Sequence, residues 1–218
     1  MARTQSRRSR SDRGDFGKSV FINCPFDAAY LPLLRPLLFT IIDLGFVPRI
    51  ASDLSESGQS RIDRIVKLIR RSKYAIHDLS RIKASKPGEL FRLNMPFELG
   101  IDVGCRLFKN GCRSKVCLIL EERKYRYQAA ISDMAGSDIA VHGNKPAQVV
   151  KVIRDWLNAH ASLSAVGPAK IWARFNEFMA YKDDLLKARG FSKKNIEELS
   201  TNDLIRSMKS WAAANSVQ

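Results

Sequence analysis

The sequence predicts an α/β protein built on a flavodoxin-like, doubly wound sheet of five parallel strands in the order 2-1-3-4-5. Three observations lead to this fold class. Short apolar runs alternate with segments of helical periodicity, which is the pattern of strands joined by crossover helices. Most of these runs are apolar throughout, as in strands that are covered on both faces. Polar side chains follow the first and third runs, and the carboxyl ends of those two strands are neighbours in this strand order.

The five expected strands are short apolar runs bounded by polar residues. They comprise residues 20–22, 46–51, 74–77, 116–120 and 138–141. Pro48 in the second run has no N–H to donate to a neighbouring strand, which favours the edge of the sheet or the start of a strand.

Helices are expected between these strands and after the last one. The first, residues 30–44, is apolar on nearly all sides, and Gly45 ends it. Ser60 precedes a second helix as its cap, and Asn94 is expected to be the N-cap of a third. Residues 146–160 form an amphipathic pattern that would cover one face of the sheet.

The length and composition of the chain indicate a globular protein with one main domain. With 218 residues, of which 45% are hydrophobic, the chain can form one domain with an appendage. Residues 1–17 are basic and cannot pack, so a disordered tail is expected there. No apolar run reaches the roughly 18 residues of a membrane helix, and no secretory signal is recognisable. The expectation is a cytoplasmic protein without membrane contact.

The chain divides into two ordered parts after the tail. Residues 18–162 hold the expected strands and form the α/β domain, and a small-residue linker follows. Residues 163–218 have helical periodicity, with Gly190 ending one helix and Ser192 and Ser200 capping two more. Such a short helical appendage cannot bury much surface alone. It is expected to dock on the α/β domain or on a second subunit, so a homo-oligomer is one of two alternatives.

The formal net charge of +15 raises the question of nucleic-acid binding. Much of this charge recurs on one expected helix face. The residues are Arg61, Arg64, Lys67, Arg70 and Arg71. Contact with RNA or DNA through this basic surface and a merely solvated helix face are equal alternatives at this point.

Four cysteines and three histidines show no spacing typical of a metal site. The cysteines are Cys24, Cys105, Cys112 and Cys117, with no CxxC pair among them. No metal is therefore expected, and the cysteines are interpreted as reduced and packed. Cys24 stands out because it follows the first strand, where a ligand would bind.

The candidate site lies where the first and third strands end. Asp78 and Ser80 follow the third strand, and Glu98 is expected in the first turn of the helix that Asn94 caps. A carboxylate in a first turn is stabilised by the helix dipole and stays ionised. His77, inside or at the end of the strand, is interpreted as a core histidine with satisfied hydrogen bonds.

Glu98 and Asp78 are the candidate catalytic residues. The candidate substrate-binding residues are Asn23, Cys24, Pro25, Phe26, Asp27, Ser80 and Asn94. Each has a structural alternative: a glutamate near a helix start can serve the dipole, Asp78 can cap the turn after its strand, and Asn94 can cap its helix.

The pattern Asp78-x-Ser80, followed by Asn94-x-x-x-Glu98-Leu-Gly, resembles the core of the nucleoside 2-deoxyribosyltransferase-like proteins and of the related TIR domains. The segment from Ser19 to Asp27 resembles their first strand and substrate loop. The resemblance covers residues 18–160. It implies N-glycosidic chemistry at the glutamate, with a nucleoside, a nucleotide or NAD as substrate and without a cofactor. It also implies a role in antiviral defence, since prokaryotic relatives act as effectors against phage.

Two functional hypotheses follow from this resemblance. One is an N-glycosidase or N-glycosyl transferase, in which a carboxylate stabilises an oxocarbenium-like transition state or forms a covalent intermediate. The other is a catalytically inactive, TIR-like nucleotide-sensing or protein-interaction module. The transferases usually carry an aspartate a few residues before the glutamate, where this chain has Asn94. That departure favours the second hypothesis, and the retained Glu98-Leu99-Gly100 favours the first.

Overall fold

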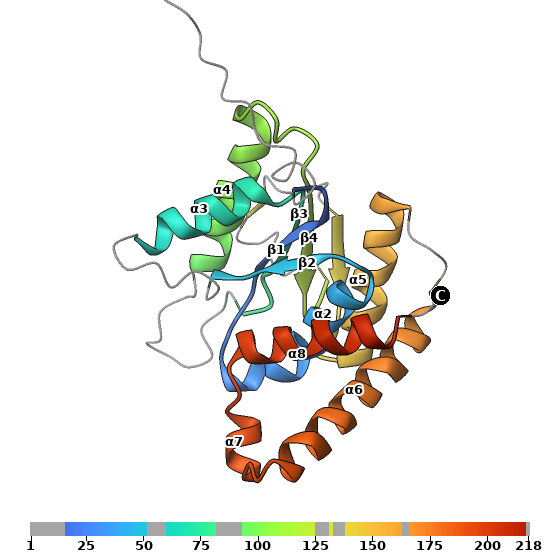
Figure 1. Cartoon of the computed structure of the whole chain (residues 1–218). Helices are drawn as coiled ribbons and strands as arrows, with labels where there is room; N and C mark the ends of the chain where they lie inside the picture. The colour runs from blue at the N-terminus through green and yellow to red at the C-terminus, as the bar shows by residue number, and fades with distance from the viewer. Residues whose placement is uncertain are drawn as a thin grey trace, which may run out of the picture.

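A computed structural model describes residues 16–51, 60–81, 93–124, 131–132, 138–162 and 166–216. Within these residues, five parallel strands form one sheet in the order β2-β1-β3-β4-β5 (Figure 1). The strands are β1 (Ser19–Asn23), β2 (Val47–Arg49), β3 (Tyr74–Asp78), β4 (Val116–Glu121) and β5 (Asp138–Val141). The predicted fold class and strand order are confirmed.

The edge position of Pro48 is also confirmed. β2 pairs with β1 on one side and has no second neighbour in the sheet of described residues, so a missing N–H leaves no gap in a ladder there. β2 is shorter than the predicted run at both ends, because Phe46 lies before the strand and Ile50 after it, and both pack in the core. On its other side β1 pairs with β3, in a register that places Asn23 beside His77.

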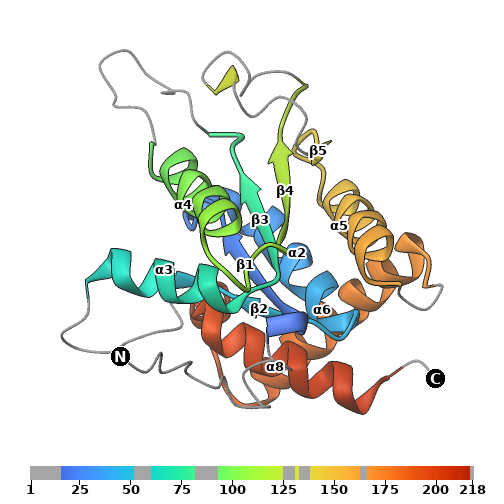
Figure 2. The ribbon, with the colours of Figure 1, turned by 90° about the horizontal axis from the view of Figure 1, so that it is seen from above.

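Helices cover both faces of the sheet, and the strands distribute their side chains accordingly. α2 (Leu31–Asp43) and α5 (Pro146–Ala161) lie on one face, and α3 (Arg61–Arg71) and α4 (Asn94–Phe108) lie on the other (Figure 2). Val20, Ile22 and Ile76 pack with α2 and α5, whereas Phe21 and Ala75 pack with α3. Since successive strand residues point to opposite faces, both faces are apolar and the strands read as continuous apolar runs.

α2 lies in the middle of the molecule. It is preceded by the short 3-10 helix η1 (Ala28–Tyr30) and is followed by Gly45, whose φ of 80° is a left-handed conformation that glycine adopts at little cost. One side of α2 packs on the sheet. On the other side, the ring of Phe39 contacts the rings of Phe175, Phe178 and Trp211, with centroids 5.6–5.7 Å apart.

Those aromatic partners belong to the C-terminal helices α6 (Pro168–Ala188) and α8 (Thr201–Ala214), which the short helix α7 (Lys193–Glu197) separates along the chain. Of the two docking partners expected for this segment, the α/β domain is the one that the structure presents. A buried ion pair adds to the contact, with Arg174 Nη2 2.7 Å from Asp43 Oδ1. The predicted caps are confirmed, because the side chains of Ser192 and Ser200 accept hydrogen bonds from the backbone of Asn195 and Asp203.

The predicted N-terminal tail falls outside the described residues except for its last two positions. Of these, Phe16 joins the domain, because its carbonyl oxygen accepts a hydrogen bond from the backbone N–H of Lys73 at 3.0 Å. Within the described residues, none of the helices combines the length and the hydropathy that a membrane span requires.

Candidate functional site

Three acidic side chains surround one buried thiol at the carboxyl ends of β1 and β3. Cys24 follows β1 and is fully buried. Burial raises the pKa of Cys24 well above its usual value, and the nearby carboxyl groups of Asp78, Glu98 and Asp27 raise it further, in that order. The thiol therefore stays protonated, which fits the interpretation of Cys24 as a packed residue rather than a nucleophile.

Asp78 is the most completely bonded of the three acids. Its Oδ1 accepts hydrogen bonds from the backbone N–H of Ser80, at 2.8 Å, and from the Ser80 hydroxyl. Its Oδ2 accepts one from the Tyr30 hydroxyl and lies 3.2 Å from His142 Nε2. Three hydrogen bonds and the close His142 ring therefore take up most of the roughly four acceptor positions of this carboxylate.

The charge of Asp78 is held by these neighbours. Burial acts to raise its pKa, but the contacts with His142, Ser80 and Tyr30 outweigh burial, so the pKa of Asp78 lies below its usual value. Burial and the adjacent carboxylate also raise the pKa of Tyr30, which keeps its hydroxyl protonated as a donor. Asp78 is thus an ionised, extensively hydrogen-bonded anion at the base of the site.

His142 was not predicted as a site residue. It directly follows β5, at the same edge of the sheet as Asp78, and it is fully buried. Its Nδ1 accepts a hydrogen bond from the backbone N–H of Asn144 at 3.0 Å, so the proton of the neutral ring is on Nε2, facing Asp78. Its place after the fifth expected strand was the one sequence signal that could have pointed to it.

Asp27 is paired at the mouth of the site. Arg81 Nη1 lies 2.7 Å from both of its carboxylate oxygens. The same carboxylate accepts a hydrogen bond from the backbone N–H of Tyr30 at 3.1 Å, which caps η1. Both side chains of the pair are about one-third exposed, at 34% and 32%. Asp27 is therefore a neutralised rim residue whose side chain also shapes the loop after β1.

Glu98 lies further along its helix than the sequence predicted. Leu93 already has helical backbone angles, φ −74° and ψ −10°, and it is the N-cap position of α4. The prediction that Asn94 caps the helix is wrong, and Asn94 is instead the exposed first helical residue. The prediction that Glu98 sits in the first turn is also wrong, because no acidic residue lies there.

This shift changes the electrostatics of Glu98. The helix dipole acts mainly within the first turn, and Glu98 is only 6% exposed. Burial raises its pKa from the usual value, and Arg61 acts in the opposite direction. No hydrogen bond or ion pair joins its carboxyl group to another described residue. The helix start therefore does not stabilise the charge of Glu98 as expected. Glu98 is instead a buried carboxyl group that protonates more readily than an ordinary glutamate.

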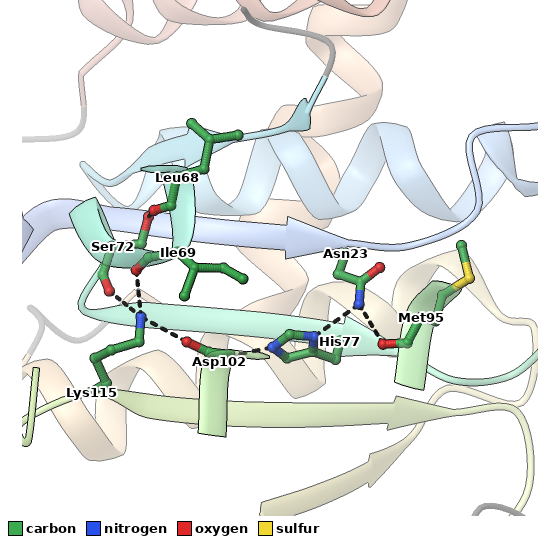
Figure 3. A network of polar contacts seen from close by, with 8 residues as sticks. All are labelled: Asn23, Leu68, Ile69, Ser72, His77, Met95, Asp102 and Lys115. Carbon is green, nitrogen blue, oxygen red and sulfur yellow. Dashed lines mark hydrogen bonds and ion pairs between the residues drawn. The ribbon is translucent and has the colours of Figure 1, made fainter. Parts of the chain in front are cut away.

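A second polar network runs along the α4 side of the sheet (Figure 3). Asn23 Nδ2 lies 3.0 Å from His77 Nδ1 and donates to the carbonyl oxygen of Met95 at 2.8 Å. His77 Nε2 lies 3.2 Å from Asp102 Oδ2, and Lys115 Nζ lies 2.9 Å from Asp102 Oδ1. The interpretation of His77 as a core histidine with satisfied hydrogen bonds is confirmed.

Asp102 and Lys115 carry buried charges of opposite sign. Burial acts to raise the pKa of Asp102, but His77 and Lys115 outweigh it and the pKa lies below its usual value. His77, Asp102 and Cys117 present ligand atoms within 4.8 Å of one another, the spacing of a metal site. The ammonium group of Lys115 already supplies the positive charge there, and it would repel a metal cation.

The remaining predicted residues differ in exposure. Pro25 is buried, Ser80 is buried against Asp78, and Phe26 is 41% exposed on the loop after β1. The basic residues of α3 differ in exposure: Arg61, Arg70 and Arg71 are exposed, whereas Arg64 and Lys67 are half-buried. Contact with nucleic acid through this surface stays a prediction.

Comparison with known proteins identifies no relative, since no family model, no curated protein and no solved structure matches this chain.

Proposed function

We propose that this chain cleaves or transfers N-glycosidic bonds of a nucleoside, a nucleotide or NAD, with Glu98 as the reacting carboxyl group. The observation that carries the proposal is the state of Glu98. Its carboxyl group is buried, is free of hydrogen bonds to described residues and lies near Cys24 at the switch point between β1 and β3. Ligands of open α/β sheets bind at that point.

The chemistry of the bond suits such a group. When a glycosidic C–N bond breaks, its electron pair leaves with the base and positive charge develops on the sugar. A carboxylate that is not bound to protein donors can stabilise this charge or form a covalent ester with the anomeric carbon. Attack by water then gives hydrolysis, and attack by a second base gives transfer.

The surroundings of Glu98 support a substrate of this class. The ionised Asp78 sits below the site, where its negative charge favours a cationic transition state. Phe26 offers an exposed aromatic ring on the loop that carries Asp27, and a nucleobase can stack on such a ring. Arg61, which acts electrostatically on Glu98, favours a substrate with a phosphate group.

The test is the release of base by the purified chain. NAD and a panel of nucleosides and nucleotides are incubated with it, and free base is separated and quantified. Glu98→Gln keeps the shape of the side chain and removes its charge, so turnover should fall by at least about 100-fold, or roughly 2.7 kcal/mol of transition-state stabilisation. Glu197→Gln, on the exposed helix α7, is the matched control and should react like the wild type. Equal turnover by Glu98→Gln would contradict the mechanism.

A second candidate function is nucleotide sensing without turnover, by a TIR-like module. It is favoured by the surroundings of Asp78, whose carboxylate already accepts three hydrogen bonds from the protein and lies 3.2 Å from His142 Nε2, so this residue has little capacity left for a ribose. Isothermal titration with the same panel distinguishes the two. Tight binding of a nucleotide by wild type, with no base released over hours, would assign the sensing function.

A further inference from the structure

We propose that Asn23, His77, Asp102 and Lys115 form a positioning array that fixes α4 on the sheet and thereby sets the place of Glu98. The array would fix α4 whatever the protein does, and only its effect on turnover rests on the proposed function. None of the four side chains needs to touch a substrate for it.

The contacts of the array bracket Glu98 along α4. Asn23 donates to the carbonyl oxygen of Met95, three residues before Glu98, at 2.8 Å. His77 and Lys115 hold Asp102, four residues after Glu98, at 3.2 and 2.9 Å. Both ends of this two-turn segment are therefore tied to β1, β3 and the start of β4 (Figure 3).

Apolar packing alone would hold this segment less specifically. Between the two polar ties, Leu99 is fully buried against Leu79 and Ile119. This small cluster resists separation of α4 from the sheet, but hydrophobic contact is non-directional and permits sliding. Hydrogen bonds at both ends have preferred distances and angles, so they fix the position of the helix along the strands.

The hydrogen bonds also fix the proton positions. Asn23 Nδ2 faces two acceptors, the carbonyl oxygen of Met95 and His77 Nδ1. His77 Nδ1 must then carry no proton, so the neutral ring holds its proton on Nε2 and donates it to Asp102. Lys115 Nζ donates hydrogen bonds to the carbonyl oxygens of Ile69 and Ser72 while it pairs with Asp102, so its position is fixed as well.

The decisive variant is Asn23→Asp, which keeps the size of the side chain and removes both donors. A carboxylate there cannot donate to Met95, and beside His77 it can only accept, so His77 Nδ1 has to become a donor. In 15N NMR, the neutral ring of His77 in the wild type should have its proton on Nε2. In the variant, Nδ1 should carry a proton. Asn176→Asp, on the exposed side of α6, is the matched control and should leave His77 unchanged.

Hydrogen exchange measures the consequence for the helix. In Asn23→Asp, the backbone amides of Phe97, Glu98 and Leu99 should exchange at least about 10-fold faster than in the wild type, while those of α5 keep their rates. A wild-type His77 with its proton on Nδ1 would overturn the array even if the variant did not fold. An unchanged exchange rate in the folded variant would overturn the positioning role.

Turnover separates this proposal from the proposed function. If wild type releases base, Asn23→Asp should lower kcat at least about 10-fold with KM changed less than about 2-fold, because Glu98 is misplaced and binding groups are retained. A rise in KM with kcat unchanged would instead make Asn23 a substrate-binding residue and reject the positioning role. If wild type releases no base from any substrate, the proposed function fails, and the NMR and exchange results still decide the array.

Discussion

At the scale of single residues, the two candidate catalytic carboxyl groups have opposite environments. Asp78 is surrounded by donors from Tyr30, Ser80 and His142, and its pKa is lowered. Glu98 is buried without a hydrogen-bond donor among the described residues, and its pKa is raised. Pairs of acids whose environments separate their pKa values are typical of sites with distinct chemical roles. Here the separation assigns the fixed charge to Asp78 and the reactive carboxyl group to Glu98.

The raised pKa of Glu98 predicts that this residue lowers stability at neutral pH. The pKa of Glu98 in the folded state exceeds its value in the unfolded state. The contribution of its protonated form to the free energy of unfolding is therefore fully present below the unfolded pKa of about 4.3, and it is lost as pH rises through the folded pKa. Glu98→Gln removes the buried charge. The variant should therefore be more stable than the wild type at pH 7, and the difference should disappear below about pH 4. Urea unfolding at both pH values measures this, and a variant less stable at pH 7 would contradict it.

Asp78→Asn should have the opposite effect. An amide places an NH2 donor where one oxygen of the carboxylate accepts hydrogen bonds, and the carboxylate accepts three in all, so we expect a loss of about 2–3 kcal/mol in the free energy of unfolding at pH 7. Because the folded pKa of Asp78 lies below its unfolded value of about 3.9, the loss should persist above that pH and shrink as pH falls through the folded pKa. Urea unfolding from pH 7 to pH 3 provides the measurement. Asp155→Asn, on the exposed side of α5, is the control and should stay within about 0.5 kcal/mol of wild type.

At the scale of helices and strands, the sequence predicted most of the elements. Apolar runs placed all five strands to within a few residues, because strands buried on both faces carry an unbroken signal. The sequence-based prediction failed at the start of α4. Asn94 is a typical N-cap residue, whereas nothing about a leucine at position 93 indicates that it takes the N-cap position with helical backbone angles. Ser80 was predicted beside Asp78, but two other partners of Asp78, Tyr30 and His142, were missed, since Tyr30 for example is 48 residues away along the chain. Only the folded topology brings such residues together.

Replacement by alanine should have opposite effects on stability at two glycines, one at the end of a helix and one inside a helix. Gly45 ends α2 with a φ of 80°, and an added Cβ would meet no atom within 4 Å. Gly45→Ala should therefore cost about 1 kcal/mol through backbone strain alone. Gly100 lies inside α4 with equally open space around an added Cβ. Gly100→Ala should add up to about 1 kcal/mol, since alanine favours the helix.

Thermal unfolding of the two variants, measured side by side, tests this contrast. The midpoint should fall for Gly45→Ala and rise for Gly100→Ala. Two shifts in the same direction would show that packing rather than backbone conformation dominates at one of the sites.

At the scale of the whole molecule, the C-terminal helices are part of the main core. Ile171, Phe178 and Met208 are fully buried, in the same cluster as Val20 and Leu38. Ending the chain after residue 167 removes these side chains and exposes the outer side of α2. The unfolding midpoint should fall by at least about 10 °C, or the protein should become insoluble, because each large apolar side chain loses burial worth about 1.5–3 kcal/mol.

Deleting residues 2–15 is the control for this truncation, and it retains Phe16, which bonds to Lys73. This variant should unfold at the temperature of the full chain. Equal stability of the C-terminal truncation and the full chain would mean that α6 and α8 contribute nothing to the core.

The middle position of α2 has a consequence for synthesis on the ribosome. Residues 31–43 are covered on one side by the sheet and on the other by helices that end at Ala214. At translation rates of about 5–20 residues per second, the outer side of α2 therefore waits many seconds for its partners. During that time Phe39 and its neighbours on the nascent chain lack their packing partners, and the domain completes its folding only after α8 has been synthesised.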